Sequence, residues 1–110
     1  MLLSNRVTII TGGATGIGRS TAIKFAEEGC DIAIADISTM EANETLNQVG
    51  KRGREGLAVE CDITDSKHVH DTVNQVINKF GKVDILVNTA GGTGEVKSPD
   101  IRGIANITEE

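Results

Sequence analysis

The chain has 110 residues, of which 38% are hydrophobic and 25% are charged, and its formal net charge is −5. This size and composition predict one globular domain with an aliphatic core, because the sequence has two Phe and neither Trp nor Tyr. The acidic balance and the shortage of stacking aromatics argue against a nucleic-acid partner. No apolar run approaches the ~20 residues that a membrane-spanning helix needs, so we expect a cytoplasmic protein with no membrane partner.

Apolar runs alternate four times with helical stripes along the chain. We expect strands at residues 6–11, 30–36, 56–61 and 83–88. This alternation is typical of βαβ units, in which helices cover both faces of a parallel sheet. The sequence therefore predicts an α/β fold of the Rossmann type, a partial, doubly wound parallel sheet of about four strands with three covering helices.

Three helices are predicted between these strands from apolar periodicity and from end signals. The first helix is expected to end at Gly29. Ser38 and Glu41 have the spacing of a capping box and begin the second helix, and Thr64 or Asp65 caps the third. The expected buried positions are Gly18, Ala22, Phe25 and Ala26 in the first helix, Ala42, Leu46 and Val49 in the second, and Val69, Val73, Val76, Ile77 and Phe80 in the third.

The segment from Val7 to Gly18 predicts a site for a nucleotide phosphate. In this segment an apolar strand stops at glycines and the chain restarts as a helix. A helix N-terminus offers unpaired amide N–H groups, and glycines let an anion approach them without meeting a Cβ atom. Gly12, Gly16 and Gly18 are placed for this. Their Gly-x-x-x-Gly-x-Gly spacing lacks a Gly-Lys-Ser/Thr ending, so an ATPase or GTPase is a weak hypothesis.

Asp36 is expected at the end of the second strand, eighteen positions after Gly18. There a carboxylate can accept hydrogen bonds from the adenosine ribose hydroxyls, which favours NAD over NADP. A 2′-phosphate beside this carboxylate would meet a repulsion of roughly 1–4 kcal/mol. Neither Thr15 nor Ile37 supplies a base to offset it. The alternative is that Asp36 only ends the strand and caps a turn.

Asp62 and Asn88 are expected at the ends of the third and fourth strands. Ligands of open parallel sheets bind beyond the carboxyl ends of strands, so these two residues would join Asp36 on one rim. Two structural alternatives remain open. Asp62 is alternatively a turn or helix-capping acid. Asn88 is equally well explained as an amide that ties neighbouring strands together.

The cysteines and histidines indicate no site. Cys30 and Cys61 have no metal-ligand spacing with each other or with His68 and His70, so we expect two buried, reduced thiols and no metal. The two histidines are two positions apart on a helix and face different directions. We expect them at the surface, without a shared metal or proton-transfer role.

Four motifs together resemble the N-terminal half of the short-chain dehydrogenase/reductase family. They are Thr11–Gly18, Asp36, Asp62-Ile63 and Asn88-Thr89-Ala90-Gly91, in this order at the ends of successive strands. The resemblance implies that the first motif holds the cofactor pyrophosphate, that Asp36 selects NAD, that the third lies against adenine and that the fourth supports the sheet beside the cofactor. The cofactor-binding residues that it implies are Gly12, Thr15, Gly16, Ile17, Gly18, Asp36, Ile37, Asp62, Ile63, Asn88, Ala90 and Gly91.

The sequence departs from the family pattern in two places. Thr89 stands where a second asparagine is usual, and it lacks that amide. The family's catalytic Tyr-x-x-x-Lys has no counterpart, because the chain contains no tyrosine. Ser98 and Asn106 do not match the family's catalytic serine and asparagine. No catalytic residue is therefore assigned.

The resemblance implies that this chain binds the cofactor and that the catalytic residues belong to the rest of an enzyme. Residues 1–90 would be dinucleotide-binding βαβ units, and residues 91–110 a loop into a helix cut at its first turn, in a single incomplete domain. The complete protein would be a homo-oligomeric oxidoreductase that transfers hydride between a nicotinamide and an alcohol or ketone substrate. This chain alone would be inactive, and its apolar fourth strand would be an exposed edge prone to self-association.

The alternative function is a stand-alone, non-catalytic NAD-binding or regulatory module. A flavodoxin-like or receiver-like domain is disfavoured, because it gives no reason for the three glycines of the first turn.

Overall fold

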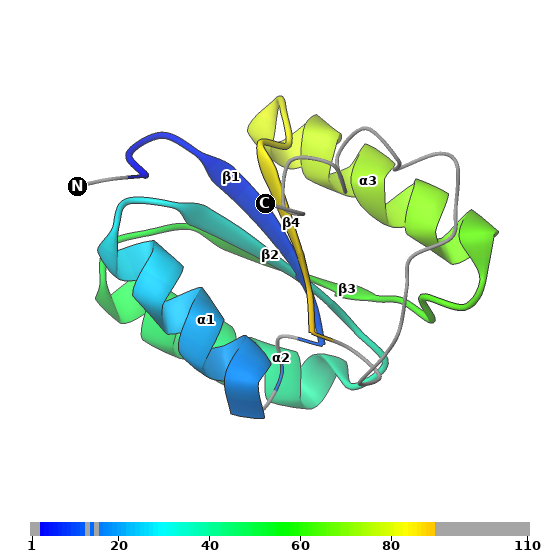
Figure 1. Ribbon diagram of the computed structural model, residues 1–110, viewed down its shortest axis with the longest axis horizontal. Helices are drawn as coiled ribbons and strands as arrows, with labels where there is room; N and C mark the ends of the chain where they lie inside the picture. The colour runs from blue at the N-terminus through cyan, green and yellow to red at the C-terminus, as the bar shows by residue number, and fades with distance from the viewer. Residues whose placement is uncertain (1–2, 13, 15, 90–110) are drawn as a thin grey trace.

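The computed structural model describes residues 3–12, 14 and 16–89, and in this part of the chain strands and helices strictly alternate. The elements are β1 (Val7–Thr11), α1 (Gly16–Glu27), β2 (Asp31–Asp36), α2 (Thr39–Lys51), β3 (Gly56–Glu60), α3 (Ser66–Phe80) and β4 (Ile85–Asn88). The strands form one parallel sheet in the order β3-β2-β1-β4 (Figure 1). The predicted α/β class and the four-stranded parallel sheet are confirmed.

Helices cover both faces of this sheet, with α1 and α2 on one face and α3 on the other (Figure 1). Alternate residues of a strand point to opposite faces, so the sheet contributes to two separate cores. Ile32 and Ile34 of β2 belong to the core under α1 and α2. Ala33 and Ala35 belong to the core under α3, together with Val76. The fold is therefore doubly wound, as the sequence predicts.

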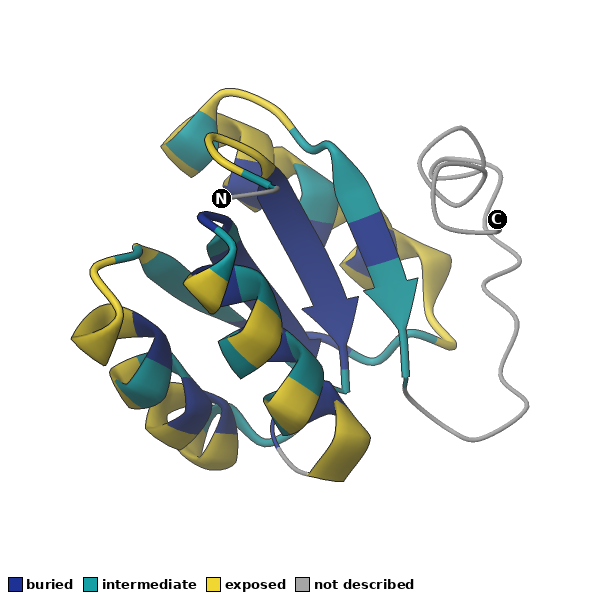
Figure 2. Cartoon of the chain, turned by 60° about the vertical axis from the view of Figure 1, so that its left-hand side comes forward, coloured by how far each residue is buried: buried dark blue, intermediate teal, exposed yellow. Residues whose placement is uncertain are grey.

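The strand β1 is one of the two inner strands of the sheet, and all five of its residues are buried (Figure 2). It pairs with β2 on one side and with β4 on the other. The chain first builds the sheet outward from β1 through β2 to β3, then returns through α3 to place β4 on the opposite side. This reversal makes the carboxyl end of β1 the switch point at which open α/β sheets bind ligands.

The helices begin near their predicted caps, with one difference in bonding. Asp65 is the N-cap of α3, and its side chain accepts the N–H of Lys67 at 2.9 Å. Ser38 is the N-cap of α2, and its hydroxyl accepts the N–H of Glu41 at 3.4 Å. The capping box is not reciprocal, because the Ser38 N–H donates to a carboxylate at the end of β2 instead of to Glu41.

The buried faces of α2 and α3 include threonines that the apolar pattern does not predict. Thr45 in α2 and Thr72 in α3 are buried. The prediction that Ile77 is buried is wrong, since 43% of it is exposed. At about 100° per residue, Ile77 lies about 100° around the helix from Val76, which faces the sheet. The buried stripe of α3 therefore runs through Thr72 on the other side of Val76.

The first helix ends at Glu27, two residues before the predicted Gly29. Gly29 has φ +101°, and a Cβ atom there would lie 2.9 Å from the Cα of Ser4. The backbone of Ser4 packs directly on this glycine, and the Leu3 N–H donates to the Glu28 carbonyl at 2.8 Å. Both the backbone conformation and the close approach therefore require glycine at this position.

Candidate functional site

The carboxyl ends of the four strands meet at one edge of the sheet, because all the strands are parallel. The register places Thr11 opposite Asn88 and Asp36 opposite Glu60. The Gly12 N–H donates to the Ala35 carbonyl at 3.0 Å and so continues the pairing of β1 with β2 past the end of β1. The structure thus brings the first glycine, Asp36 and Asn88 to one rim.

The turn between β1 and α1 presents backbone at the centre of this rim. Gly12 has φ 74° and Gly16 has φ 58°, in the left-handed region that disfavours other residues. A Cβ atom on Gly16 would meet no described atom within 4 Å, so the backbone there borders open space. The first N–H groups of α1 have no acceptor within the helix and carry the positive end of its dipole. This geometry suits an anion.

The other residues of the turn divide between inward and outward positions. Gly18 is buried in the first turn of α1. Ile17 is 77% exposed at the same helix end. Ile37, which follows Asp36, is also exposed. Both isoleucines are therefore exposed apolar side chains, and their contact with a cofactor stays a prediction.

Side-chain hydrogen bonds join β4 to the glycine turn. The Thr11 hydroxyl donates to Asn88 Oδ1 at 2.7 Å, which confirms that Asn88 ties neighbouring strands together. The Thr89 hydroxyl donates to the Thr11 carbonyl at 2.6 Å and lies 3.3 Å from the Gly12 carbonyl. Thr89 thus supplies a donor to the turn although it lacks the amide of the family's usual asparagine.

Asp36 has a structural contact at the end of β2. Its Oδ1 accepts the N–H of Ser38 at 2.9 Å, which holds the turn into α2. The turn role predicted as the alternative for Asp36 is therefore confirmed. A carboxylate has two oxygens with several acceptor positions, so this bond leaves capacity for a hydroxyl donor. The ribose contact stays a prediction.

Asp62 closes the turn that leads into α3. Its Oδ1 accepts the Thr64 hydroxyl at 2.7 Å and the Thr64 N–H at 3.0 Å. These hydrogen bonds lower the pKa of the Asp62 carboxyl below its ordinary value. Ile63 packs partly buried against the core under α3. The turn role of Asp62 is confirmed, whereas its contact with adenine stays a prediction.

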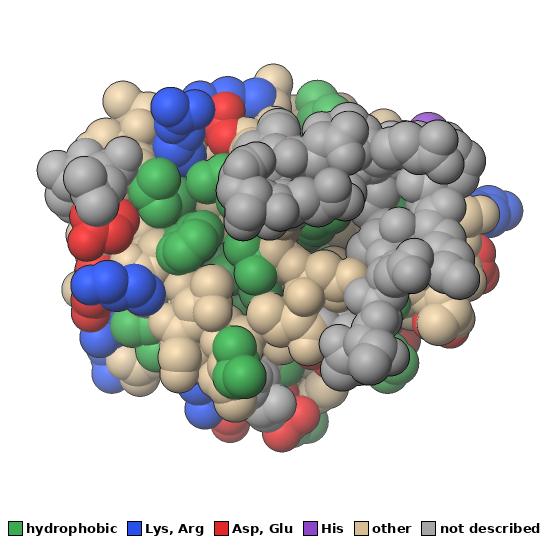
Figure 3. All heavy atoms as spheres, in the orientation of Figure 1, with side chains coloured by type: hydrophobic (Ala, Val, Ile, Leu, Met, Phe, Trp, Pro, Cys, Tyr) green, Lys and Arg blue, Asp and Glu red, His purple; other side chains and the backbone are tan. Residues whose placement is uncertain are grey.

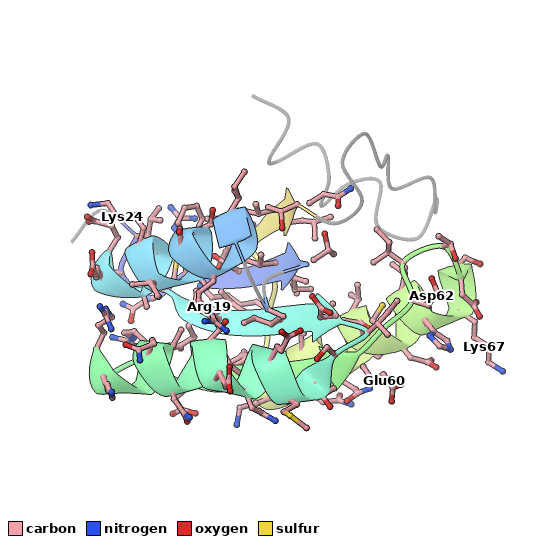
Figure 4. All side chains as sticks on the ribbon, turned by 90° about the horizontal axis from the view of Figure 1, so that it is seen from below. Arg19, Lys24, Glu60, Asp62 and Lys67 are labelled. Atoms are coloured by element: carbon pink, nitrogen blue, oxygen red, sulfur yellow. The ribbon has the colours of Figure 1, made fainter. Side chains whose placement is uncertain are left out.

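His68 also contributes to this turn, a contact that the sequence does not predict. Its Nδ1 accepts the Asp62 N–H at 3.1 Å, and its Nε2 lies 3.8 Å from Asp65 Oδ2. No sequence signal marks His68, because a contact between positions six apart across a turn follows no helical or strand period. Figure 4 shows Asp62 on this segment, beyond the carboxyl end of β3.

Several predicted residues lie outside the described part of the chain. They are Thr15, Ala90 and Gly91, together with the predicted loop and helix start at 91–110 and with Ser98 and Asn106. Their roles stay predictions. Among the described residues, no group of histidine, cysteine and acidic side chains is arranged to hold a metal ion, and none of the described helices could cross a membrane.

The two cysteines are free and buried, as predicted. Burial raises the pKa of the Cys30 thiol, partly offset by a hydrogen bond from Thr8. Burial likewise raises the pKa of the Cys61 thiol. Few thiolates form at neutral pH under these conditions, so neither residue is suited to act as a nucleophile.

The charged side chains on the face shown in Figure 3 are mixed in sign. Lys and Arg side chains lie next to Asp and Glu around the margin of that view, with hydrophobic side chains between them. Among the described residues several charges are paired, for example Arg52 with Glu27 at 3.2 Å and Arg54 with Asp31 at 3.2 Å. A polyanion is attracted by an extended field of one sign, and the charged side chains visible in this view do not group by sign.

Comparison with known proteins shows the same family along nearly the whole chain. The sequence model described as short chain dehydrogenase matches residues 6–106. The (2S)-[(R)-hydroxy(phenyl)methyl]succinyl-CoA dehydrogenase subunit BbsD of Thauera aromatica is 42% identical over 91 residues, which are 83% of this chain and 37% of that protein. The chain thus spans little more than a third of that relative.

Two further comparisons bear on length and on cofactor. The short-chain dehydrogenase/reductase homolog YusS of Bacillus subtilis strain 168 is 33% identical over 102 residues, 92% of this chain and 94% of that protein. The crystal structure of an NAD+-bound xylitol dehydrogenase matches with a TM-score of 0.75 and 34% identity, over 78% of this chain and 33% of that one.

Proposed function

Because the chain belongs to the short-chain dehydrogenase family, we propose that it is the NAD-binding portion of an oxidoreductase that transfers hydride between a nicotinamide and an alcohol or ketone substrate. The observation that carries this proposal is the glycine turn at the carboxyl end of β1, where Gly12 and Gly16 adopt left-handed conformations before α1. The first N–H groups of a helix have no acceptor within the helix. The pyrophosphate would bind there. The bound NAD+ of the related xylitol dehydrogenase structure supports a dinucleotide as the ligand.

The proposed preference for NAD over NADP rests on Asp36. Its carboxylate stands at the end of β2, next to the strand that leads into the glycine turn, and would accept the adenosine ribose hydroxyls. The bond from Ser38 orients this carboxylate before a ligand arrives. A 2′-phosphate at the same position would be repelled. Asp62 and Ile63 would border the adenine from the end of β3.

The proton transfer of the reaction is assigned to groups outside this sequence. The 110 residues contain no tyrosine, so they cannot supply the family's phenol. When bound, the nicotinamide supplies the hydride chemistry, and the residues of this chain hold the adenosine and pyrophosphate. In the complete protein we expect a small-molecule substrate, a homo-oligomer and a cytoplasmic location.

A second candidate function is a stand-alone, non-catalytic NAD-binding or regulatory module. The observation that favours it is the Bacillus subtilis relative, which this chain matches along 94% of its length. A chain of this size would bind dinucleotide through the same glycine turn without chemistry. Reading the gene past the codon for Glu110 separates the two candidates. A continuation into a serine and Tyr-x-x-x-Lys supports the enzyme portion, and a stop codon supports the module.

Calorimetric titration of NAD and NADP into the 110-residue chain tests the binding function that both candidates share. The expected result is one NAD bound per chain with a lower dissociation constant than that of NADP. Absence of NAD binding by the folded chain would reject the proposed function. Tighter binding of NADP would reject the role of Asp36 alone.

A further inference from the structure

A buried hydroxyl on α2 is hydrogen-bonded to the glycine turn. Thr45 lies in the middle of α2, and its exposed fraction is 0%. Its hydroxyl donates to the carbonyl of Ala14, a buried residue between Gly12 and Gly16, at 3.0 Å. Thr45 thus joins two segments that are 31 positions apart in the sequence.

Arg19 of α1 completes this contact. Its Nε donates to the Thr45 hydroxyl at 2.9 Å, and its Nη2 donates to the Ala14 carbonyl at 2.9 Å. Glu44 Oε1 lies 3.5 Å from the same Nη2. Figure 4 shows Arg19 between α1 and α2. The planar guanidinium has five N–H donors in a fixed geometry. Two of them hold the helix hydroxyl and the turn carbonyl together.

The Ala14 carbonyl therefore accepts two hydrogen bonds, which use both of its lone pairs. A peptide group is planar, so it cannot rotate without breaking both bonds. These bonds direct the carbonyl oxygen toward α2. The helix α2 packs on β2 and β3, whereas the switch point lies between β1 and β4. A carbonyl oxygen turned toward the switch point would repel a pyrophosphate.

We propose that Thr45 and Arg19 are positioning residues that hold the Ala14 carbonyl away from the pyrophosphate site and keep the glycine turn ready to bind a dinucleotide. The inference rests on the proposed function. The helix α2 would then position two parts of the site. Its N-cap residue Ser38 donates its N–H to Asp36, the proposed ribose-binding carboxylate, and Thr45 binds the glycine turn.

Thr45→Val tests the proposal, because valine keeps the shape of the side chain and removes the hydroxyl. The dissociation constants of NAD and of adenosine, which has no phosphate, are measured by NMR titration for each variant. We expect NAD binding to weaken about tenfold or more in Thr45→Val, as for loss of a buried hydrogen bond. Adenosine binding should stay within about twofold, and Thr45→Ser should restore NAD binding.

Arg19→Lys provides a second, more exposed test. Lysine keeps the positive charge but cannot donate in two directions from one plane. We expect it to weaken NAD binding as Arg19→Met does, whereas direct attraction between the charge and phosphate would leave Arg19→Lys close to wild type. Unchanged NAD affinity in Thr45→Val, equal losses for NAD and adenosine, or wild-type behaviour of Arg19→Lys would each overturn the proposal.

Failure of the proposed function is distinguishable from failure of this inference. If the unsubstituted chain binds no NAD, the function is rejected. If it binds NAD and Thr45→Val binds equally well, only the positioning role is rejected.

Discussion

The charge of Asp36 is the single side-chain property expected to decide between the two nicotinamide cofactors. Asp36→Asn keeps an oxygen to accept the Ser38 N–H and removes the negative charge. Unit charges 4 Å apart repel by about 1 kcal/mol in water and by about 4 kcal/mol at an effective dielectric of 20. We expect the ratio of the NADP to the NAD dissociation constant to fall at least about fivefold, as measured by calorimetry.

The matched control for this substitution is Asp36→Ala, which removes the charge and the acceptor for Ser38 together. The ratio of its NADP to its NAD dissociation constant should fall as well. Its free energy of unfolding should also fall, because the turn into α2 loses a hydrogen bond. A ratio that does not change in Asp36→Asn would show that this carboxylate does not select the cofactor.

The Asp62 turn predicts a pH dependence of stability. Hydrogen bonds from Thr64 lower the pKa of the Asp62 carboxyl in the folded chain below its ordinary value of 3.8. The charged form is therefore favoured by folding, and its contribution is present above the ordinary pKa and lost as the pH falls through the lowered pKa. Asp62→Ala should lower the free energy of unfolding in urea at neutral pH, and the difference should shrink in acid.

Asp71→Ala is a suitable control for Asp62→Ala, since Asp71 is an exposed acid on α3. Its effect on unfolding should be small at both pH values. A deficit of Asp62→Ala that persists unchanged in acid would mean that the charge of the carboxylate does not stabilise the turn.

At the residue scale, motif spacing predicts which residues lie at the carboxyl edge of the sheet. It does not predict the hydrogen bonds of Thr45 and Arg19 to the glycine turn. The glycines and Asp36 could be placed because strand ends and a glycine turn are local features of sequence. Thr45 could not, because a threonine within a helical pattern gives no sign that its hydroxyl crosses to another segment. The donor role of Thr89 was equally hidden, since it depends on how closely β4 lies against the glycine turn.

At the element scale, two glycine substitutions should have opposite effects. Gly29→Ala places a Cβ atom against Ser4 at φ +101° and should lower the free energy of unfolding by about 1–3 kcal/mol. Gly50→Ala lies within α2, where a Cβ atom meets nothing within 4 Å, and should raise it by about 0.5–1 kcal/mol. Urea denaturation of both variants measures these changes. Equal changes in the free energy of unfolding would contradict the packing of Ser4 on Gly29.

Element boundaries were predictable to within about two residues, and β4 shows why the rest were not. The predicted strand begins at residue 83, whereas β4 begins at Ile85. Asp84 Oδ2 accepts the Val7 N–H at 2.8 Å, so a side chain takes the place of a backbone carbonyl at the start of this pairing. The order of helices and strands could be predicted from hydrophobic periodicity. The burial of Thr45 and Thr72 could not, because it depends on how the helices pack on the sheet.

At the scale of the whole molecule, β4 predicts self-association. One edge of β4 pairs with β1, and no described strand pairs with the other. Unpaired edges recruit further strands, and lysine on an edge discourages this. We expect the apparent mass in sedimentation equilibrium to rise with concentration, and Ile85→Lys to reduce the rise. A chain that stays monomeric at high concentration and unfolds cooperatively would contradict this prediction.

The proposed NAD-binding function depends most on one contact, that of the dinucleotide pyrophosphate with the backbone between β1 and α1. An amide-resolved NMR titration of the chain with NAD tests this directly. We predict that the largest saturable shifts occur at the amides of Gly12, Gly16, Ile17 and Gly18, followed by Asp36. Saturable binding with its largest shifts elsewhere, and with these glycine amides unmoved, would contradict the account.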